Sequence, residues 1–265
     1  MNHNILITSA GKRVALTRFF KETLNRFFPE AKVFITDMNP EMAPVSYVCD
    51  GAFKVPRVTA PEYPEVLLRI CEENKVGMVI ATIDTELQLL ADLKESFRKK
   101  GIHIMVSNKE FISLCRDKRN TIKFFESHGV RVPKEVDKYN PSFPLFAKPY
   151  DGSLSTNLHY IKSSDELTKE ILEDEKLIFM EYIDKTVYKE ITADMYFGKD
   201  NSVKCIVPRE RIEIRAGEIN KGRTLKNEIL DFLKKKLGYI DGCIGCICVQ
   251  LFFHPETKDI VGIEI

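Results

Sequence analysis

Two oxygen-bearing side chains near the end of the 265-residue chain could hold a metal ion. Residues 246–251 alternate between apolar and small or polar types, as in a strand whose side chains point to opposite faces. A hairpin that turns at Thr257 would place Gln250 directly opposite Glu264, with Cβ atoms about 5 Å apart. An amide oxygen and a carboxylate suit Mg²⁺, which shares phosphate oxygens with a substrate. A solvated hairpin face would give the same pattern, so both interpretations stay open.

A lysine at the end of an apolar run precedes a loop that could cover phosphates. Lys148 is followed by Gly152, Ser153 and Ser155. The amides and hydroxyls of such a loop can face phosphate oxygens, and the lysine adds a point charge. An ordinary β-turn beside a solvated lysine is the alternative.

A third segment could hold a nucleobase. An apolar run ends at Glu181-Tyr182-Ile183, where backbone groups could bind an adenine edge while apolar neighbours cover its faces. Glu190 follows on the next expected strand. A solvated strand face accounts for the same residues.

Basic residues alternate along one further segment. Arg209, Arg211 and Arg215 share a face of an expected strand. Guanidinium groups bind carboxylate or phosphate oxygens in a bidentate way. This face could therefore meet an anionic substrate, or it could be an exposed, salt-bridged surface.

The elements that position these residues fall into two patterns. In the first hundred residues strands alternate with helices, which predicts a parallel sheet covered by helices. Strands are expected at 4–8, 32–36, 77–82 and 102–106, and helices at 14–28, 63–74 and 86–99. In such sheets ligands gather beyond the carboxyl ends of the strands. The turn Gly11-Lys12-Arg13 lies there, but it matches neither a Walker motif nor a dinucleotide fingerprint, so a plain tight turn is favoured.

The pattern changes after a helical region at 108–129, which predicts a domain boundary near residues 108–115. Strands are expected at 143–148, 157–161, 176–182, 187–197, 202–208, 209–215, 245–254 and 258–265, with helices at 164–173 and 224–237. This order is typical of an α+β domain.

Composition excludes several classes of function. A formal net charge of +1 gives no field that would favour nucleic acid or an acidic membrane. No apolar run approaches the roughly 20 residues of a membrane-spanning helix, and the first residues do not resemble a signal peptide. We therefore expect a cytoplasmic protein with reduced thiols. Cys243, Cys246 and Cys248 could bind a metal or act in redox chemistry, but small residues on a strand are the favoured interpretation.

Taken in order, these segments resemble ATP-grasp proteins, in particular those similar to the large subunit of carbamoyl phosphate synthase. The resemblance covers essentially the whole chain. It rests on Ile-Thr-Ser-Ala-Gly-Lys-Arg near the start, Asp117-Lys118, Lys148-Pro149, Met180-Glu181-Tyr182-Ile183, the Arg-Glu-Arg strand, and Gln250 with Glu264. It implies an α/β pre-ATP-grasp domain with a Rossmann-like parallel sheet at 1–110. Two α+β ATP-grasp lobes would follow at 111–182 and 183–265.

The resemblance also implies a role for each matched residue. Lys118 and Lys148 would hold the ATP phosphates, and the loop residues Gly152, Ser153 and Ser155 would cover them. Adenine would be bound by Glu181, Tyr182 and Ile183, and ribose by Glu190. Arg211 and Arg215 would face the transferred phosphate and the acyl substrate, and Gln250 and Glu264 would hold Mg²⁺, with Mn²⁺ as an alternative. The implied partners are a small-molecule carboxylate and an amine or ammonia, without nucleic acid or membrane, and a homodimer is compatible with this picture.

Two departures from the family pattern concern activity. The phosphate loop has few glycines, and the family's Glu-x-Asn-Pro-Arg motif is interrupted because the sequence ends at Ile265. Either the chain is truncated and its parent continues this motif, which is the favoured expectation, or the protein is defective in metal binding. The implied function is an ATP-dependent ligase that forms a C–N bond through an acylphosphate. A non-catalytic nucleotide-binding or regulatory protein is the alternative, and a Rossmann-like oxidoreductase is disfavoured because the glycine fingerprint is missing.

Overall fold

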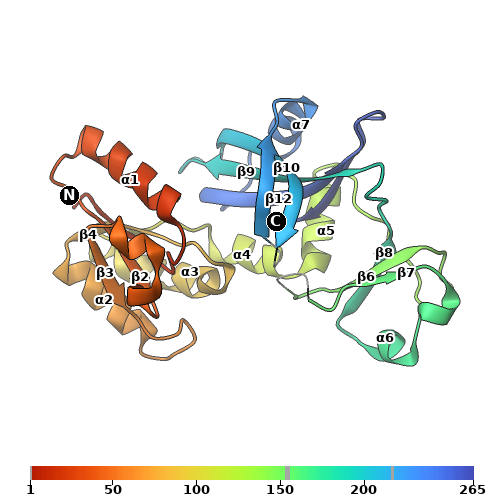
Figure 1. Ribbon diagram of the computed structural model, residues 1–265, viewed down its shortest axis with the longest axis horizontal. Coiled ribbons are helices and arrows are strands. Elements are labelled where there is room, and N and C mark those ends of the chain that lie inside the picture. Colours follow the sequence, from red (N-terminus) through yellow and green to blue (C-terminus); the bar gives the residue numbers. More distant parts are fainter. Residues whose placement is uncertain (1, 153–155, 216–217) are drawn as a thin grey trace. The chain divides into compact units, whose positions relative to one another are not determined.

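The computed structural model describes residues 2–152, 156–215 and 218–265, and the chain divides into two units, Met1–Ile112 and Ser113–Ile265. Each unit has its own sheets (Figure 1). In the described residues, no helix is long and apolar enough to cross a membrane.

The first unit is built on a parallel sheet with the strand order β3-β2-β1-β4-β5. Its strands are β1 (Asn4–Ile7), β2 (Val33–Asp37), β3 (Gly51–Lys54), β4 (Val76–Ile80) and β5 (His103–Ile104), and its helices are α1 (Val14–Phe27), α2 (Tyr63–Glu73) and α3 (Asp84–Arg98). Two short 3₁₀ helices, η1 (Pro40–Met42) and η2 (Pro44–Tyr47), lie between β2 and β3. The predicted parallel α/β sheet is confirmed, whereas β3 was not predicted.

Alternation along β1 explains why helices cover both faces of this sheet. Ile5 and Ile7 join the core beneath α1, and Leu6 joins the core beneath α2 and α3. At the carboxyl end of β1, the buried carboxylate of Glu86 accepts hydrogen bonds from Thr8 Oγ1 (2.5 Å) and from the Ser9 hydroxyl. These bonds hold the turn after β1, in which Ser9 has a positive φ of 47°.

The second unit contains two antiparallel sheets, with orders β11-β10-β9-β12-β13 and β7-β6-β8. The larger consists of β9 (Lys189–Phe197), β10 (Val203–Arg215), β11 (Glu218–Thr224), β12 (Gly245–Phe253) and β13 (Ile260–Glu264), and the smaller of β6 (Leu145–Pro149), β7 (His159–Ile161) and β8 (Leu177–Glu181). Helix α4 (Lys109–Arg116) spans the division between the units, and the helices of the second unit are α5 (Lys118–Ser127), η3 (Ser164–Glu166), α6 (Lys169–Glu173) and α7 (Glu228–Leu237). Helix α7 buries Ile229, Leu233 and Leu237.

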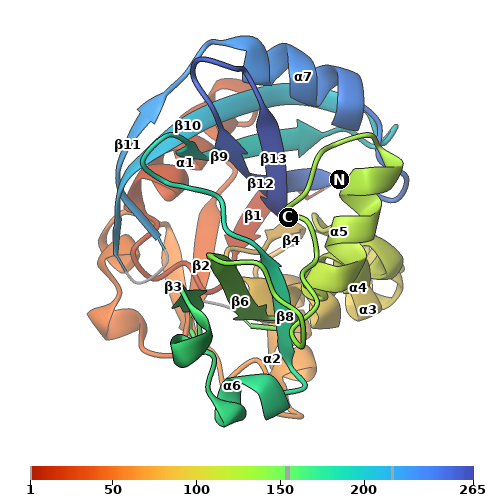
Figure 2. The same cartoon turned by 90° about the vertical axis from the view of Figure 1, so that its right-hand side faces the viewer.

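Three of the expected elements differ from the structure for an identifiable local reason. Strands 202–208 and 209–215 form one strand, β10, because β9 pairs with its first part and β11 with its second part (Figure 2). The helix expected at 224–237 starts only at Glu228, after β11, where the Asn227 side chain accepts a hydrogen bond from Ile229 N. The helix expected at 164–173 is divided into η3 and α6, because Thr168 caps the second segment.

Gly262 in β13 allows α5 to pack closely on the larger sheet. A Cβ atom at this position would lie 2.8 Å from the ring of Phe125, which is fully buried. We expect Gly262→Ala to lower the free energy of unfolding by about 1–3 kcal/mol, because the crowded core must shift. Urea unfolding measures this change. If the clash is the cause, adding Phe125→Leu should give a total loss smaller than the sum of the two single losses; simple additivity would contradict it.

Candidate functional site

A cleft in the second unit is lined by residues of both sheets. Its empty volume is about 860 Å³, part of which is open to solvent. Nine of the residues singled out from the sequence line it: Lys118, Lys148, Gly152, Glu181, Tyr182, Ile183, Glu190, Gln250 and Glu264. The structure therefore brings together segments that are more than a hundred residues apart in the chain.

Two lysines and one carboxylate meet at one side of this cleft. Lys118 Nζ lies 3.4 Å from the Glu264 carboxylate and donates a hydrogen bond to Gly152 O at 2.5 Å. Lys148 is only 7% exposed. Burial lowers its pKa to about 8, to which the like charge of Lys118 contributes, while Glu264 acts in the opposite direction. Two lysines therefore lie beside a single carboxylate here, and burial destabilises the positive charge that is not neutralised.

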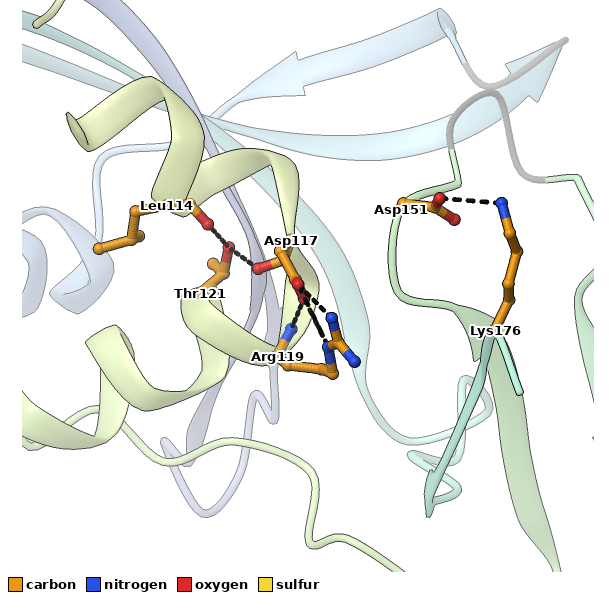
Figure 3. Close-up of polar contacts among 6 residues, drawn as sticks. All are labelled: Leu114, Asp117, Arg119, Thr121, Asp151 and Lys176. Carbon is orange, nitrogen blue, oxygen red and sulfur yellow. Dashed lines mark hydrogen bonds and ion pairs between the residues drawn. The ribbon is translucent and has the colours of Figure 1, made fainter. Parts of the chain in front are cut away.

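The position of Lys118 is set by the start of α5. Asp117 caps this helix by accepting a hydrogen bond from Arg119 N, and its carboxylate also binds the Arg119 guanidinium (Figure 3). That guanidinium lies 3.7 Å from the centre of the Tyr150 ring. Lys118 N donates to Tyr150 O at 2.8 Å, so the first turn of α5 is fastened to the end of β6.

The start of the predicted phosphate loop is anchored on the smaller sheet. Asp151 pairs with Lys176 at 3.0 Å, as Figure 3 shows, and Tyr150 N donates to Lys176 O. Gly152 lines the cleft. Ser153 and Ser155 lie outside the described residues.

Gln250 and Glu264 are directly opposed in the pairing of β12 with β13. The predicted opposition of these two residues is confirmed, but the regular register around Thr257 is not, because the pairing shifts by one residue between Gln250 and Leu251 and Leu251 pairs with Gly262. Both side chains line the cleft on the side of the two lysines. Their amide and carboxylate oxygens are suitable ligands for Mg²⁺, although two donors fill only part of its shell of six, which water and phosphate must complete.

The cleft also has apolar walls. Phe146, Leu158, Met180, Phe252 and Ile263 line it together with residues 181–183, here called the hinge. In the hinge Ile183 is buried, and the Tyr182 ring stacks on Tyr160 with centroids 4.2 Å apart. Such a slot suits a flat ring whose edge meets backbone groups.

The two predicted arginines have different surroundings. Arg211, with a side chain only 6% exposed, lies 3.1 Å from Glu190 and donates to Thr192 Oγ1. Arg215 is 73% exposed, pairs with Glu213 and does not line the cleft. The pairing of β10 with β11 is irregular between the two positions. Arg211 touches the site through Glu190, and Arg215 is not brought to it.

Several residues that shape the site were missed in the sequence. Lys185 lines the cleft and pairs with Glu190 at 3.2 Å. Arg131 binds the Glu181 carboxylate at 2.7 Å. The only signal for Arg131 was a charged residue between two valines before Pro133. Cys246 and Cys248 lie on β12, and among the described residues no group of three or more His, Cys, Asp and Glu side chains could hold a metal ion.

Comparison with known proteins adds to this geometry. Residues 5–105 match the model of the PylC-like N-terminal domain. No curated protein shows significant sequence similarity to the chain.

Solved structures share the fold over nearly the whole chain. Rhizobium etli pyruvate carboxylase is similar with a TM-score of 0.73 and 14% identity, over 100% of this chain and 27% of that protein. Campylobacter jejuni biotin carboxylase is similar with a TM-score of 0.72 and 14% identity, over 98% of this chain and 64% of that protein. Staphylococcus aureus N5-carboxyaminoimidazole synthetase, in complex with ADP, is similar with a TM-score of 0.70 and 15% identity, over 98% of this chain and 69% of that protein. This chain thus spans less than two thirds of the length of the two carboxylases.

These similarities define the class of fold. The chain has the ATP-grasp fold, preceded by a parallel-sheet unit similar to the PylC-like N-terminal domain. The fold predicted from the resemblance is confirmed.

Proposed function

We propose that the chain binds Mg·ATP in this cleft and uses it to activate a carboxylate for C–N bond formation. The observation that supports this most directly is the convergence of Lys118, Lys148, Gln250 and Glu264 beside an apolar slot that ends at the hinge. The names of the structural neighbours, which include carboxylases and a synthetase bound to ADP, agree with such chemistry.

The residues present fit a nucleotide and a divalent cation. Burial lowers the pKa of Lys148 because it destabilises the charged ammonium, and an anionic phosphate bound beside it would stabilise that charge. Gln250 and Glu264 would hold Mg²⁺, or Mn²⁺ as an alternative, and the hinge would hold adenine.

In the proposed reaction a substrate carboxylate oxygen attacks the γ-phosphorus of ATP, and ADP leaves. The nitrogen of an amine or of ammonia then attacks the carbonyl carbon of the acylphosphate, and inorganic phosphate leaves as the C–N bond forms. Lys118 and Lys148 neutralise charge on the transferring phosphoryl group, and Mg²⁺ held by Gln250 and Glu264 would supply further positive charge there. No protein nucleophile is needed. Gln250 at the first ligand position favours carbamoyl phosphate synthase-like chemistry, so bicarbonate and ammonia belong among the candidate substrates.

Calorimetric titration of the full chain with ATP, with and without Mg²⁺, tests the binding step. We expect Mg²⁺ to strengthen ATP binding about tenfold, because a cation held by Gln250 and Glu264 would offset the negative charge of the phosphates. ADP release is then measured with a panel of carboxylates and amines, bicarbonate and ammonia included. Absence of ATP binding would contradict the proposal.

A second candidate function is nucleotide binding without turnover. It is favoured by the exposed position of Arg215 and by the pairing of Arg211 with Glu190, which leave the acyl side of the site with fewer cations than the resemblance implies. ATP binding that is indifferent to Mg²⁺, with ADP release at background for every substrate pair, would support this candidate.

A further inference from the structure

Residues 130–136, here called the strap, connect the two sheets of the second unit. At one end of the strap, Arg131 O accepts a hydrogen bond from Gly262 N of β13 at 2.7 Å, and Arg131 forms a parallel bridge with Val261. At the other end, Lys134 O accepts one from Glu181 N of β8, also at 2.7 Å. The strap therefore extends both sheets at the place where β8 leads into the hinge.

The side chain of Arg131 contacts three residues from different segments of the chain. Nη2 donates to the Glu181 carboxylate at 2.7 Å, and Nη1 donates to the Asp259 carboxylate in the turn between β12 and β13. Nη1 also lies 3.3 Å from the Tyr188 hydroxyl, which itself donates to Asp259 at 2.7 Å. One guanidinium thus holds both ends of the segment 181–188, which runs from the last residue of β8 to the residue before β9.

The geometry of these contacts constrains the hinge. The Arg131 and Glu181 side chains are 35% and 32% exposed, so the charges are partly shielded from water. A planar guanidinium can bind two carboxylates at fixed angles, which an ammonium cannot do. Glu181 is held from a second side by Lys134 N, which donates to its other oxygen at 3.2 Å. The carboxylate of Glu181 is therefore engaged with the strap, while the hinge lines the cleft.

We propose that Arg131 is a positioning residue for nucleobase recognition: by tying Glu181 to Asp259 and Tyr188, it fixes the hinge in the geometry that receives adenine. Arg131 is not among the residues that line the cleft, so it acts through the hinge. This inference rests on the proposed binding of ATP. Nucleotide affinity then has two contributions, one from the base at the hinge and one from the phosphates at Lys118 and Lys148, and Arg131 affects only the first.

The test compares two probes, ADP and inorganic tripolyphosphate, by calorimetry on the full chain. Tripolyphosphate can occupy the lysine side of the cleft but has no base. Arg131→Met is expected to weaken ADP binding about tenfold, a typical coupling between distinct positions, and to leave tripolyphosphate binding unchanged. Arg131→Lys retains the charge but cannot bridge both carboxylates, so it should restore only part of the affinity for ADP. Unchanged ADP affinity, or an equal loss for both probes, would overturn the inference.

Two further variants keep the test decisive. Asp259→Asn removes one carboxylate from the guanidinium without touching the hinge, and it should shift ADP binding in the same direction by a smaller factor; it carries the test if Arg131→Met does not fold. Lys258→Met, which breaks the neighbouring exposed pair with Glu228, is the matched control and should leave both probes unchanged. A wild-type chain that binds neither probe contradicts the proposed function itself. Wild-type binding of both probes, with the Arg131 and Asp259 variants indistinguishable from it, contradicts this inference alone.

Discussion

Replacing Lys148 with methionine is expected to weaken ATP binding about 100-fold at pH 7, the loss typical of a hydrogen bond to a charged group in a buried site. The ammonium of Lys148 is buried beside Lys118 and Glu264 at the side of the cleft proposed for phosphates. Methionine retains the length of the side chain and removes its charge. Titration calorimetry with Mg·ATP measures the loss. ATP affinity within twofold of the wild-type value would contradict a phosphate role for Lys148.

The lowered pKa of Lys148 predicts how binding depends on pH. The free protein loses the ammonium charge as pH rises through about 8, so ATP affinity should fall over this range. Bound phosphate favours the charged form, and ATP binding at pH 8.5 should therefore take up protons. Calorimetry in two buffers with different ionisation enthalpies counts these protons. Lys148→Arg remains charged throughout, so its binding should show neither the proton uptake nor the fall in affinity near pH 8.

Regular alternation was enough to predict much of the fold. Ile5 and Ile7 enter one core and Leu6 the other, because each side of the parallel sheet is covered by helices. A regular hairpin also led to the opposition of Gln250 and Glu264, but in the structure this opposition depends on a register shift between Gln250 and Leu251, which the period of the strand did not reveal. Side-chain period therefore predicts which face a residue occupies wherever one face is buried.

Two edge strands escaped prediction. β3 (Gly51–Lys54) and β11 (Glu218–Thr224) lie at the margins of their sheets and pair with one neighbour each. An edge strand is held by backbone hydrogen bonds on one side and needs little apolar alternation. The sequence Glu-Ile-Asn-Lys-Gly-Arg-Thr accordingly carries almost no strand period.

The residues that position the site were predictable only where they are local. Asp117 caps α5 two residues before Arg119, which is a pattern that a sequence can reveal. Arg131 and Asp259 meet across 128 residues, and neither has a periodic context that indicates the other. Contacts of this kind depend on how the sheets are brought together, which propensity and period do not encode.

Replacing Glu264 with glutamine is expected to change ATP binding in opposite directions without and with Mg²⁺. Without the metal, Glu264 neutralises Lys118 at 3.4 Å and also stabilises the charge of Lys148. Removing this partly exposed carboxylate should strengthen metal-free ATP binding by up to about fivefold, the range of such ion pairs. Because the variant lowers the pKa of Lys148 further, the titration is made at pH 6, where Lys148 stays protonated.

With Mg²⁺ present the same substitution should remove most of the benefit of the metal. If Glu264 is a ligand, the gain in ATP affinity from Mg²⁺ should fall at least about tenfold, to little or nothing, because loss of a ligand costs at least as much as loss of a supporting residue. Glu190→Gln is the matched control: it removes the same charge from the same cleft, where Glu190 pairs with Arg211 and Lys185. It should weaken ATP binding but leave the ratio of affinities with and without Mg²⁺ unchanged. A Glu264→Gln variant with a wild-type response to Mg²⁺ would show that this carboxylate serves only to balance the lysines, and the metal would then have to be held without it.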